Sequence, residues 1–340
     1  MFCAARRGLA GDRVMDAAAM MENCTVCPRE CGVDRTAGGR GICGAPAEMI
    51  VARAALHFWE EPCISGHAGS GAVFFSGCSL RCIFCQNAEI SGVSGGLPGI
   101  SVSASELADI FLRLQDQEGA NNINLVTAAH YIPQTACALA IAKDRGLKIP
   151  VIYNTGGYEK VSSLRMLEGL VDVYLPDFKY MSPRTAGEYA YAQDYPETAK
   201  AAIAEMVRQT GPVSFYPETG YEAQDAGKPE TMLIRKGVIV RHLLLPGHVK
   251  EAKEIISYLH AAYGDAIGLS IMNQYTPMRQ MDDHPLLARR VTTREYERLI
   301  DHAIRIGVEN GYIQEGGTAK ESFIPSWDGE GVREMVRERL

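Results

Sequence analysis

The sequence predicts an α/β protein that folds as a partial barrel of six strand–helix units. Short, near-continuous apolar runs recur between residues 72 and 272, as expected for parallel strands that are buried on both faces. Amphipathic segments separate these runs, and such alternation predicts a parallel sheet with right-handed crossovers. Six units are two fewer than an eightfold barrel has, so we expect a TIM-like barrel that stays open.

The expected strands are the apolar runs themselves, and polar residues stand at the end of each run. The runs cover residues 72–75, 123–127, 151–154, 171–175, 238–245 and 269–272. In barrels of this kind the chemistry lies at the C-terminal ends of the strands. We therefore expect the polar residues to meet at one rim and to line a pocket there.

Capping residues mark the helices between the strands. Ser103 and Glu106 form a capping box at the start of one helix, which we expect to end at Gly119. Another begins with Pro133 and ends near Gly146. Further helices are expected over residues 160–167, 196–210 and 249–262, and after the capping box of Thr292 and Glu295.

Two segments fall outside the strand–helix repeat. Residues 181–236 form a long connection with one helix; loops of that length are usually functional or mobile, so a lid and a surface excursion are both open. Residues 1–20 carry three arginines among alanines without an apolar leader segment, and we expect a disordered arm. The chain then divides into an arm with a cysteine-rich region (1–50), a barrel core (51–280) and a C-terminal helical extension (281–340).

Composition and charge exclude several classes of protein. The 340 residues are enough to bury a large core, and 46% hydrophobic with 22% charged residues is ordinary for a globular protein. A net charge of −7 argues against a nucleic-acid partner held by phosphate contacts. No apolar stretch approaches the roughly 20 residues of a membrane span. We expect a cytoplasmic protein without a membrane partner.

The first of two cysteine groups has the spacing Cys24-x2-Cys27-x3-Cys31-x11-Cys43 and lies among glycines. Such a segment has too few apolar residues to fold by burial alone, and a bound metal would supply the missing stability. Four thiolates suit a closed zinc site or an auxiliary iron–sulfur cluster. A packed loop of reduced thiols is the alternative.

The second group, Cys78-x3-Cys82-x2-Cys85, directly follows the first apolar run. Cysteine thiolates are the protein ligands of iron–sulfur clusters, and ferredoxins add a fourth cysteine nearby. Here Gln86 and Asn87 follow instead, so a four-iron cluster would keep one iron open for a substrate or cofactor. Two alternatives remain: a helix face with buried cysteines at i, i+4 and i+7, and a zinc site, although structural zinc prefers four protein ligands.

The second group, with Phe84 before its last cysteine, resembles the signature of the radical S-adenosylmethionine (SAM) superfamily. The wider sequence, including residues 28–32 and 74–87, is similar to uncharacterised homologues of pyruvate formate-lyase activating enzyme. The resemblance runs from about Cys24 to beyond Gln274. It implies a partial barrel of the radical SAM type, a [4Fe–4S] cluster on the three cysteines, and SAM on the open iron. The implied activity is reductive cleavage of SAM to a 5′-deoxyadenosyl radical.

The resemblance also implies which residues bind the cofactor. These are Phe84, Thr127, Asn154, Thr155, Asp177, Lys179, Arg241 and Gln274. Phe84 resembles the residue that packs on adenine, and Gln274 stands near the place of an adenosine-contacting histidine. Residues 127–129 occupy the place of a Gly-Gly-Glu segment that contacts the SAM amino group. This chain lacks that segment, which leaves Thr127 as the candidate.

Four of these residues resemble the surroundings of the ribose and carboxylate in activating enzymes. Asn154–Thr155 and Asp177–Lys179 look like the paired strand ends there, and Thr155 with Asp177 resembles a monovalent-cation site. Lys179 can pair with a carboxylate, and the fork of Arg241 matches carboxylate geometry. A surface ion pair is the alternative for Asp177 and Lys179.

The resulting hypothesis is a radical SAM oxidoreductase related to glycyl-radical activases. It implies an electron donor such as flavodoxin or ferredoxin, and a glycyl-radical-type protein as one substrate class. A small molecule or RNA is the alternative target. Two readings from other classes stay open: an electron-transfer protein with two clusters, and a binding module stabilised by zinc.

Overall fold

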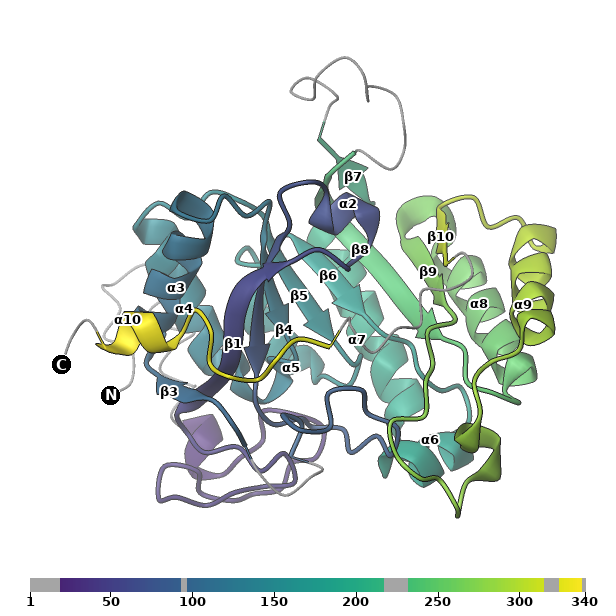
Figure 1. Ribbon diagram of the computed structural model, residues 1–340, viewed down its shortest axis with the longest axis horizontal. Helices are drawn as coiled ribbons and strands as arrows, with labels where there is room; N and C mark the ends of the chain where they lie inside the picture. Colours follow the sequence, from purple (N-terminus) through teal and green to yellow (C-terminus); the bar gives the residue numbers. More distant parts are fainter. Residues whose placement is uncertain (1–18, 93–96, 217–231, 315–323, 338–340) are drawn as a thin grey trace.

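The computed structural model describes residues 19–92, 97–216, 232–314 and 324–337 (Figure 1). Its strands form one ten-stranded sheet in the order β10-β9-β8-β6-β5-β4-β2-β1-β3, with β7 paired to β8. The strands are β1 (Met49–His57), β2 (Ser70–Phe75), β3 (Ile100–Val102), β4 (Ile123–Val126), β5 (Val151–Thr155), β6 (Val173–Pro176), β7 (Ser214–Phe215), β8 (Ile234–Leu243), β9 (Gly268–Met272) and β10 (Gly311–Ile313).

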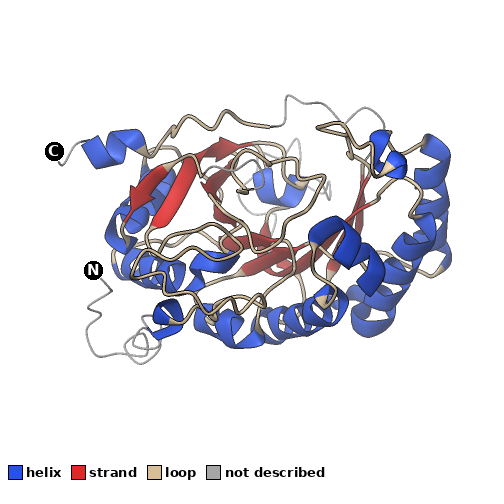
Figure 2. Cartoon of the chain, turned by 90° about the horizontal axis from the view of Figure 1, so that it is seen from below, coloured by secondary structure: helices blue, strands red, loops and turns tan. Residues whose placement is uncertain are grey.

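The sheet is mostly parallel and curled but not closed. From β2 to β10 all neighbours along the path are parallel, whereas β1 is antiparallel to β2 and β3. Seen from below, the strands follow a curve that is open on one side (Figure 2). The predicted α/β fold with an open, partial barrel is therefore confirmed. The six predicted runs are β2, β4, β5, β6, β8 and β9.

Helices cover the convex face of the curled sheet. The long ones are α3 (Ala104–Asp116), α4 (Ile132–Asp144), α7 (Tyr195–Thr210), α8 (Val249–Tyr263) and α9 (Thr293–Arg305). The shorter ones are α2 (Pro62–Ser65), α5 (Val161–Leu164), α6 (Pro183–Ala190) and α10 (Arg333–Arg337), with 3-10 turns at Ala129–Tyr131, Arg165–Leu167, Gly264–Ala266 and Pro285–Ala288. Both predicted capping boxes are present, at the starts of α3 and α9.

Strand register shows which side chains point into the barrel. Phe74, Val126 and Asn154 are paired across β2, β4 and β5, so they share one face of the sheet. Successive residues of a strand point to opposite faces, so Asn124 and Ile152 lie on that same inner face, one row nearer the strand starts. The inner face is thus apolar over β2 and carries amides over β4 and β5.

Helix α2 closes the end of the barrel where the parallel strands begin (Figure 1). Its residues Cys63 and Ile64 are buried with Ile152, Leu175 and Ile239 in a separate apolar cluster. This plug makes the opposite, C-terminal end the accessible side of the inner face. The residues just before α2 matter for the site, as shown below.

Several features differ from the sequence-based expectation. The antiparallel strand β1 and the short β3 were not predicted, and the C-terminal region adds β10 to the sheet as well as helices. The connection after β6 holds two helices, α6 and α7, where one was expected. Residues 1–18 and 217–231 lie outside the described residues, and so do the expected N-terminal arm and the possible lid. Within the described ranges, no helix is both long and apolar enough to cross a membrane.

Candidate active site at the C-terminal ends of the strands

The three-cysteine segment is a loop that leaves β2 at the C-terminal edge of the sheet. Residues 78–85 contain no helix, so the helix-face alternative is wrong. Gly77 starts the loop with φ of +94°, and a Cβ there would lie 2.9 Å from both the Cys43 carbonyl oxygen and His130 Nε2. His130 is buried and lies 2.9 Å from the Ser76 carbonyl oxygen. A glycine is therefore required at the point where the loop turns.

The three thiols are close enough to influence one another. Burial, followed by the neighbouring thiols Cys82 and Cys85, raises the pKa of Cys78. Burial also raises the pKa of Cys82, to about 11, although the positive charge of Lys179 opposes this. Burial disfavours the charged thiolate, so these cysteines would ionise only beside a positive charge or a bound metal. Metal ligation requires the thiolate form. The donor set fits an iron–sulfur cluster.

A single-ion metal site is not preformed. Among the described residues, no three His, Cys, Asp or Glu side chains are placed to hold one metal ion. A zinc ion would gather its sulfurs about 2.3 Å from one centre, whereas a cluster takes each thiolate at a different iron. This finding counts against a preformed zinc site at either cysteine group.

Arg241 organises the charged groups beside the cysteine loop. Its Nε donates to Asp177 at 3.0 Å, its Nη1 to Glu60 at 3.1 Å and its Nη2 to Asn154 at 2.6 Å. Asp177 also pairs with Lys179. The side chains of Asp177 and Lys179 are only 14% and 20% exposed, so this is not a surface ion pair. Arg241 orients Asp177 and Asn154 instead of presenting a free fork.

The charges in this network depend on one another. Burial opposes ionisation of Asp177, but Lys179 and Arg241 together lower the pKa of its carboxyl. The pKa of Lys179 is raised despite burial, chiefly by Asp177. Burial raises the pKa of Glu60 and Glu61, and the positive charge of Arg241, which also serves Asp177, opposes this shift. Lys179 therefore stays cationic beside the cysteines.

Sequence analysis missed Glu60, which lies outside the strand–helix repeat. It accepts from Asn124 at 3.2 Å and from Asn154 at 3.0 Å as well as from Arg241. Three inner-face side chains from β4, β5 and β8 thus converge on one carboxylate next to α2. A signal was present: amides within otherwise apolar strands need a buried partner.

Tyr195 is a second residue that was missed. Its buried hydroxyl accepts from the Lys179 amide at 2.8 Å and lies 2.9 Å from the carbonyl oxygens of both Gly156 and Asp177. The start of α7 thereby ties the ends of β5 and β6 together. Tyr195 positions the backbone that carries Asp177 and Lys179.

Thr155 faces the helix layer and not the barrel interior. Its hydroxyl donates to Glu159, whose second carboxylate oxygen is buried without a hydrogen-bond partner. Burial raises the pKa of Glu159 to about 7, against the effect of the Thr155 hydrogen bond. Thr155 and Asp177 therefore lie on neighbouring strand ends, but the Thr155 hydroxyl is already engaged.

Phe84, on the cysteine loop, and Gln274, after β9, lie near the end of β9. The Phe84 ring makes an edge contact with Tyr275, with centroids 5.8 Å apart, and a second with Tyr189 at 6.5 Å. Gln274 accepts a hydrogen bond from Gln314 at 3.0 Å, which links the ends of β9 and β10. Phe84 is thus part of an aromatic wall, and its contact with adenine stays a prediction.

Thr127, at the end of β4, has an unusual backbone. Its φ of +62° is in the left-handed region, which is a true outlier for a β-branched residue. The backbone amide of Thr127 donates to the Asn154 carbonyl oxygen at 2.9 Å. The strained turn brings Thr127 to the rim beside Asn154, where the resemblance assigns a contact with SAM.

The first cysteine group forms a loop, residues 24–43, that docks beside the second; we call it the knuckle. Figure 1 places it at the end of the sheet toward which β4, β5 and β6 point. Arg29 donates to the carbonyl oxygens of Ser79 at 2.9 Å and Ala190 at 2.9 Å, and Arg81 donates to that of Ile42 at 3.1 Å. The knuckle therefore packs against the loop of Cys78, Cys82 and Cys85.

The four knuckle thiols lie near enough to influence one another electrostatically. Burial, with added repulsion from the other three thiols, raises the pKa of Cys27 to about 12. Gly41 packs so closely on Cys31 that a Cβ would collide with its Sγ. Cys24, Cys27, Cys31 and Cys43 are therefore neighbours. Among the described residues, however, no three such side chains are placed to hold one metal ion.

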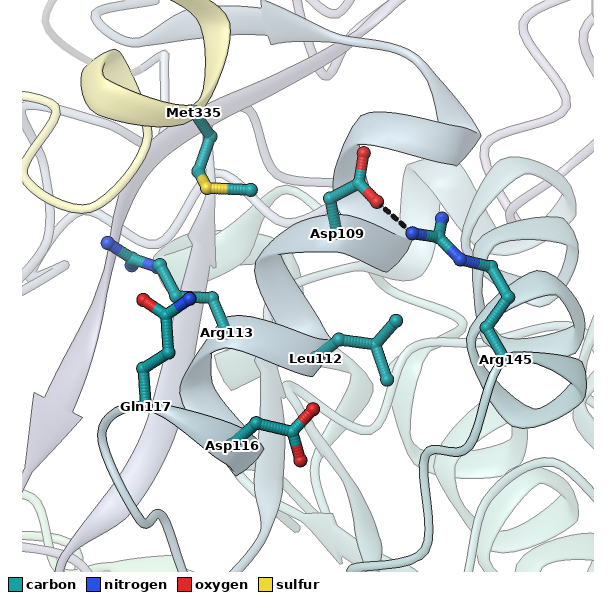
Figure 3. Close-up of a pocket in the computed structure, with 7 residues that line it drawn as sticks. All are labelled: Asp109, Leu112, Arg113, Asp116, Gln117, Arg145 and Met335. Carbon is teal, nitrogen blue, oxygen red and sulfur yellow. Dashed lines mark hydrogen bonds and ion pairs between the residues drawn. The ribbon is translucent and has the colours of Figure 1, made fainter. Parts of the chain in front are cut away.

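A surface pocket lies away from this site. It is lined on α3 by Asp109, Leu112, Arg113, Asp116 and Gln117, with Arg145 and Met335 beside them (Figure 3). Arg145 and Asp109 form an ion pair across it. The pocket is on the outer face of α3, so it is separate from the cysteine loop.

Comparisons with known proteins give limited information. No protein-family model matches the chain. The uncharacterized protein MJ0674 of Methanocaldococcus jannaschii is 27% identical over 296 residues, which cover 85% of this chain and 77% of that protein.

Two solved structures overlap with the fold at low identity. The structure of Streptococcus suis SuiB bound to S-adenosylmethionine is 13% identical with a TM-score of 0.44, covering 74% of this chain and 51% of SuiB. The FeFe-hydrogenase maturase HydG from Carboxydothermus hydrogenoformans is 13% identical with a TM-score of 0.40, covering 77% and 64%. The chain thus spans about half the length of SuiB. Overlaps at this level establish no shared activity.

Proposed function

We propose that this protein is a radical SAM enzyme that binds a [4Fe–4S] cluster through Cys78, Cys82 and Cys85. The observation that carries the proposal is the position of these three thiols, of which Cys82 is buried and the other two partly buried, on a loop at the C-terminal edge of the sheet beside Lys179 and Asp177. When bound, the cluster would supply one electron to SAM and an open iron to hold it. The products are methionine and a 5′-deoxyadenosyl radical, which removes a hydrogen atom from the substrate.

The chain's own residues would bind and orient SAM. Lys179 offers a cationic ammonium to the methionine carboxylate, and Asp177 holds that ammonium in place. Phe84, backed by Tyr275, offers an apolar face to adenine. Thr127 presents its hydroxyl at the rim. Arg241 acts through Asp177 and Asn154 and is a positioning residue.

Binding experiments test this proposal against an electron-transfer protein with two clusters. Protein reconstituted anaerobically with iron and sulfide should show broad iron–sulfur absorption, and SAM should change the electron-paramagnetic-resonance spectrum of its reduced cluster. An unchanged spectrum at saturating SAM would favour electron transfer alone. Lys179→Met should weaken SAM binding, whereas Lys148→Met, which changes an exposed lysine before β5, should not.

We also propose a second metal centre in the knuckle, formed by Cys24, Cys27, Cys31 and Cys43. The supporting observation is that these thiols are mutually close and mostly buried. Iron, sulfide and zinc analysis of the Cys78→Ala, Cys82→Ala, Cys85→Ala triple variant reports on this centre alone. Four iron atoms or one zinc per chain supports it. A metal-free triple variant that is still folded contradicts it.

The proposed electron donor is a small reducing protein such as flavodoxin or ferredoxin, as the resemblance to pyruvate formate-lyase activating enzyme implies. That resemblance also places a protein glycine among the candidate targets. Reduction by flavodoxin, followed through the loss of visible cluster absorption, tests the donor. The class of target is addressed by a structural feature considered next.

A further inference from the structure

The C-terminal segment crosses the open side of the barrel. Residues 324–335, which we call the strap, run in front of the inner face of the sheet and across β1, and they end in the first turn of α10 (Figure 1). The view from below shows the same segment lying along part of the open side of the curled sheet (Figure 2). An open barrel needs a cover there if its interior is to exclude water.

Backbone contacts fix the strap on β1. The Ala54 amide donates to the Glu330 carbonyl oxygen at 3.0 Å, and the Gly329 amide donates to that of Ala52 at 3.1 Å. These bonds occupy the part of the β1 edge that β3 leaves unpaired, since β3 pairs only with residues 49–51. Gly331 has φ of +72°, and a Cβ there would collide with the Ala54 carbonyl oxygen. Only glycine allows this close approach.

Side chains anchor the strap at both ends. Arg53 pairs with Glu330 and, at 3.8 Å, with Asp328. Val332 is fully buried in the main core. At the far end, Figure 3 shows Met335 of α10 lying over α3 beside Arg113. Arg113 itself donates to the Ala54 carbonyl oxygen at 3.0 Å. These contacts hold the strap against β1 and α3.

Trp327 carries the strap's apolar contact with the barrel interior. Its ring lies 5.2 Å from that of Phe74, at an interplanar angle of 68°. Phe74 belongs to a buried cluster with Ala72, Ile90 and Val126, and it shares the inner face with Val126 and Asn154. Phe74 is also four residues before Cys78. The indole therefore closes the interior directly beside the strand that leads to the cysteine loop.

The interior has two different walls. One is apolar, made by Phe74, Val126 and Trp327, and the other carries Asn154 with Arg241 and its carboxylates. An inner face with one apolar and one charged part suits a small organic molecule with an apolar part and a polar part. The strap lies along the side of the barrel that the sheet leaves open, next to the apolar wall.

We propose that the strap is a fixed wall of the reaction chamber, that Trp327 contacts the substrate, and that the substrate is a small molecule and not a protein or RNA. This inference rests on the proposed radical SAM function. In the reaction a carbon–hydrogen bond of the substrate breaks, the hydrogen atom forms the new bond at C5′ of 5′-deoxyadenosine, and the unpaired electron passes to the substrate.

Deuterium transfer tests the substrate class. Source cells grown in deuterium oxide provide a labelled extract, which ultrafiltration divides into a small-molecule filtrate and a macromolecular retentate. Each is offered to the reduced holoenzyme with unlabelled SAM. The inference predicts deuterium in 5′-deoxyadenosine with the filtrate. Label that comes from the retentate overturns it, even though 5′-deoxyadenosine itself still forms and the radical SAM proposal stands.

Variants test the role of Trp327. Trp327→Ala should lower deuterium transfer from the filtrate about tenfold, the loss expected for a removed aromatic contact of about 1.4 kcal/mol, and Trp327→Phe should restore most of it. Trp59→Ala, which removes the chain's other and well-exposed tryptophan, should change nothing. Unchanged transfer in Trp327→Ala contradicts a substrate contact.

A measurement without turnover tests whether the wall is fixed. In the full-length protein the Ala54 amide, bonded to Glu330, should exchange its hydrogen slowly, and Gly331→Ala should accelerate this exchange by at least tenfold. Fast exchange of Ala54 in the wild type would mean that the strap opens readily, and the inference of a fixed wall would be wrong.

Discussion

Arg241 donates to Glu60 at 3.1 Å across the inside of the barrel. The bond joins the charged rim at the C-terminal ends of the strands to the residues that precede the plug helix α2. Arg241 is the cation that Asp177, Glu60 and Glu61 share. The orientation of the rim therefore depends on a residue at the opposite end of the barrel.

This sharing predicts unequal effects of removing the partners. Arg241→Met leaves several buried carboxyl groups without their cation and should reduce the free energy of unfolding by about 3–5 kcal/mol. Glu60→Gln removes one of three competing negative charges and keeps an acceptor, so we expect a loss of about 1 kcal/mol. Urea unfolding of the metal-free variants measures both. A larger loss for Glu60→Gln than for Arg241→Met would show that Arg241 is not the shared cation.

Glu159 should make stability depend on pH. Its pKa rises from 4.5 to about 7 on folding, so the folded chain binds the proton more tightly and its stability falls as pH increases through that window. At 1.36 kcal/mol per pKa unit, the full loss is about 3 kcal/mol. Glu159→Gln should remove this dependence. The pKa of Asp177 is lowered on folding, so this residue makes stability rise with pH, but it is present in both proteins. The difference in free energy of unfolding between the wild type and the variant, compared at pH 5 and pH 8, therefore reports on Glu159 alone. Parallel stability profiles would contradict the raised pKa.

Tyr195→Phe should disturb the rim without touching SAM. The change leaves the Lys179 amide without its acceptor and should lower the free energy of unfolding by about 1–3 kcal/mol. It should also weaken SAM binding, because the strand ends that carry Asp177 and Lys179 lose their common tie. Tyr158→Phe is the matched control, since that hydroxyl donates to the carboxylate of Asp194 and not to the strand ends. Equal SAM affinity in the two variants would remove Tyr195 from the site.

Thr127→Gly should stabilise the chain while weakening SAM binding. Glycine adopts φ of +62° without strain, and relief of such an outlier is worth about 1–3 kcal/mol. The hydroxyl is lost at the same time. Thr127→Ala loses the hydroxyl but keeps the strain, so the pair separates the two effects. If both variants bind SAM like the wild type, the hydroxyl has no part in binding.

The strands of the barrel were predictable because burial on both faces leaves a run of apolar residues. β1 and β10 were not predictable in that way. β1 is interrupted by partly exposed residues such as Arg53, and β10 has only three residues. The strap was missed because its fixation depends on Gly329, Gly331 and backbone groups, which leave no periodic pattern.

The candidate site was predictable to the extent that chemistry is local in sequence. The spacing of Cys78, Cys82 and Cys85 was visible directly. The partner of Arg241 was expected to be a ligand carboxylate, but the structure pairs the guanidinium with Glu60 and Asp177. The pair Arg241–Glu60 joins residues 181 positions apart. The inner-face amides signal that a buried partner exists, but a single sequence does not tell which residue it is.

The central claim is most directly tested by the formation of 5′-deoxyadenosine from SAM by the reduced, anaerobically reconstituted protein, quantified by mass spectrometry. We expect the wild type and Cys63→Ala, which changes a buried cysteine in α2, to form it. Cys82→Ala should form none. Equal amounts from Cys82→Ala and the wild type, or none from a wild type that carries its full cluster, would contradict the account.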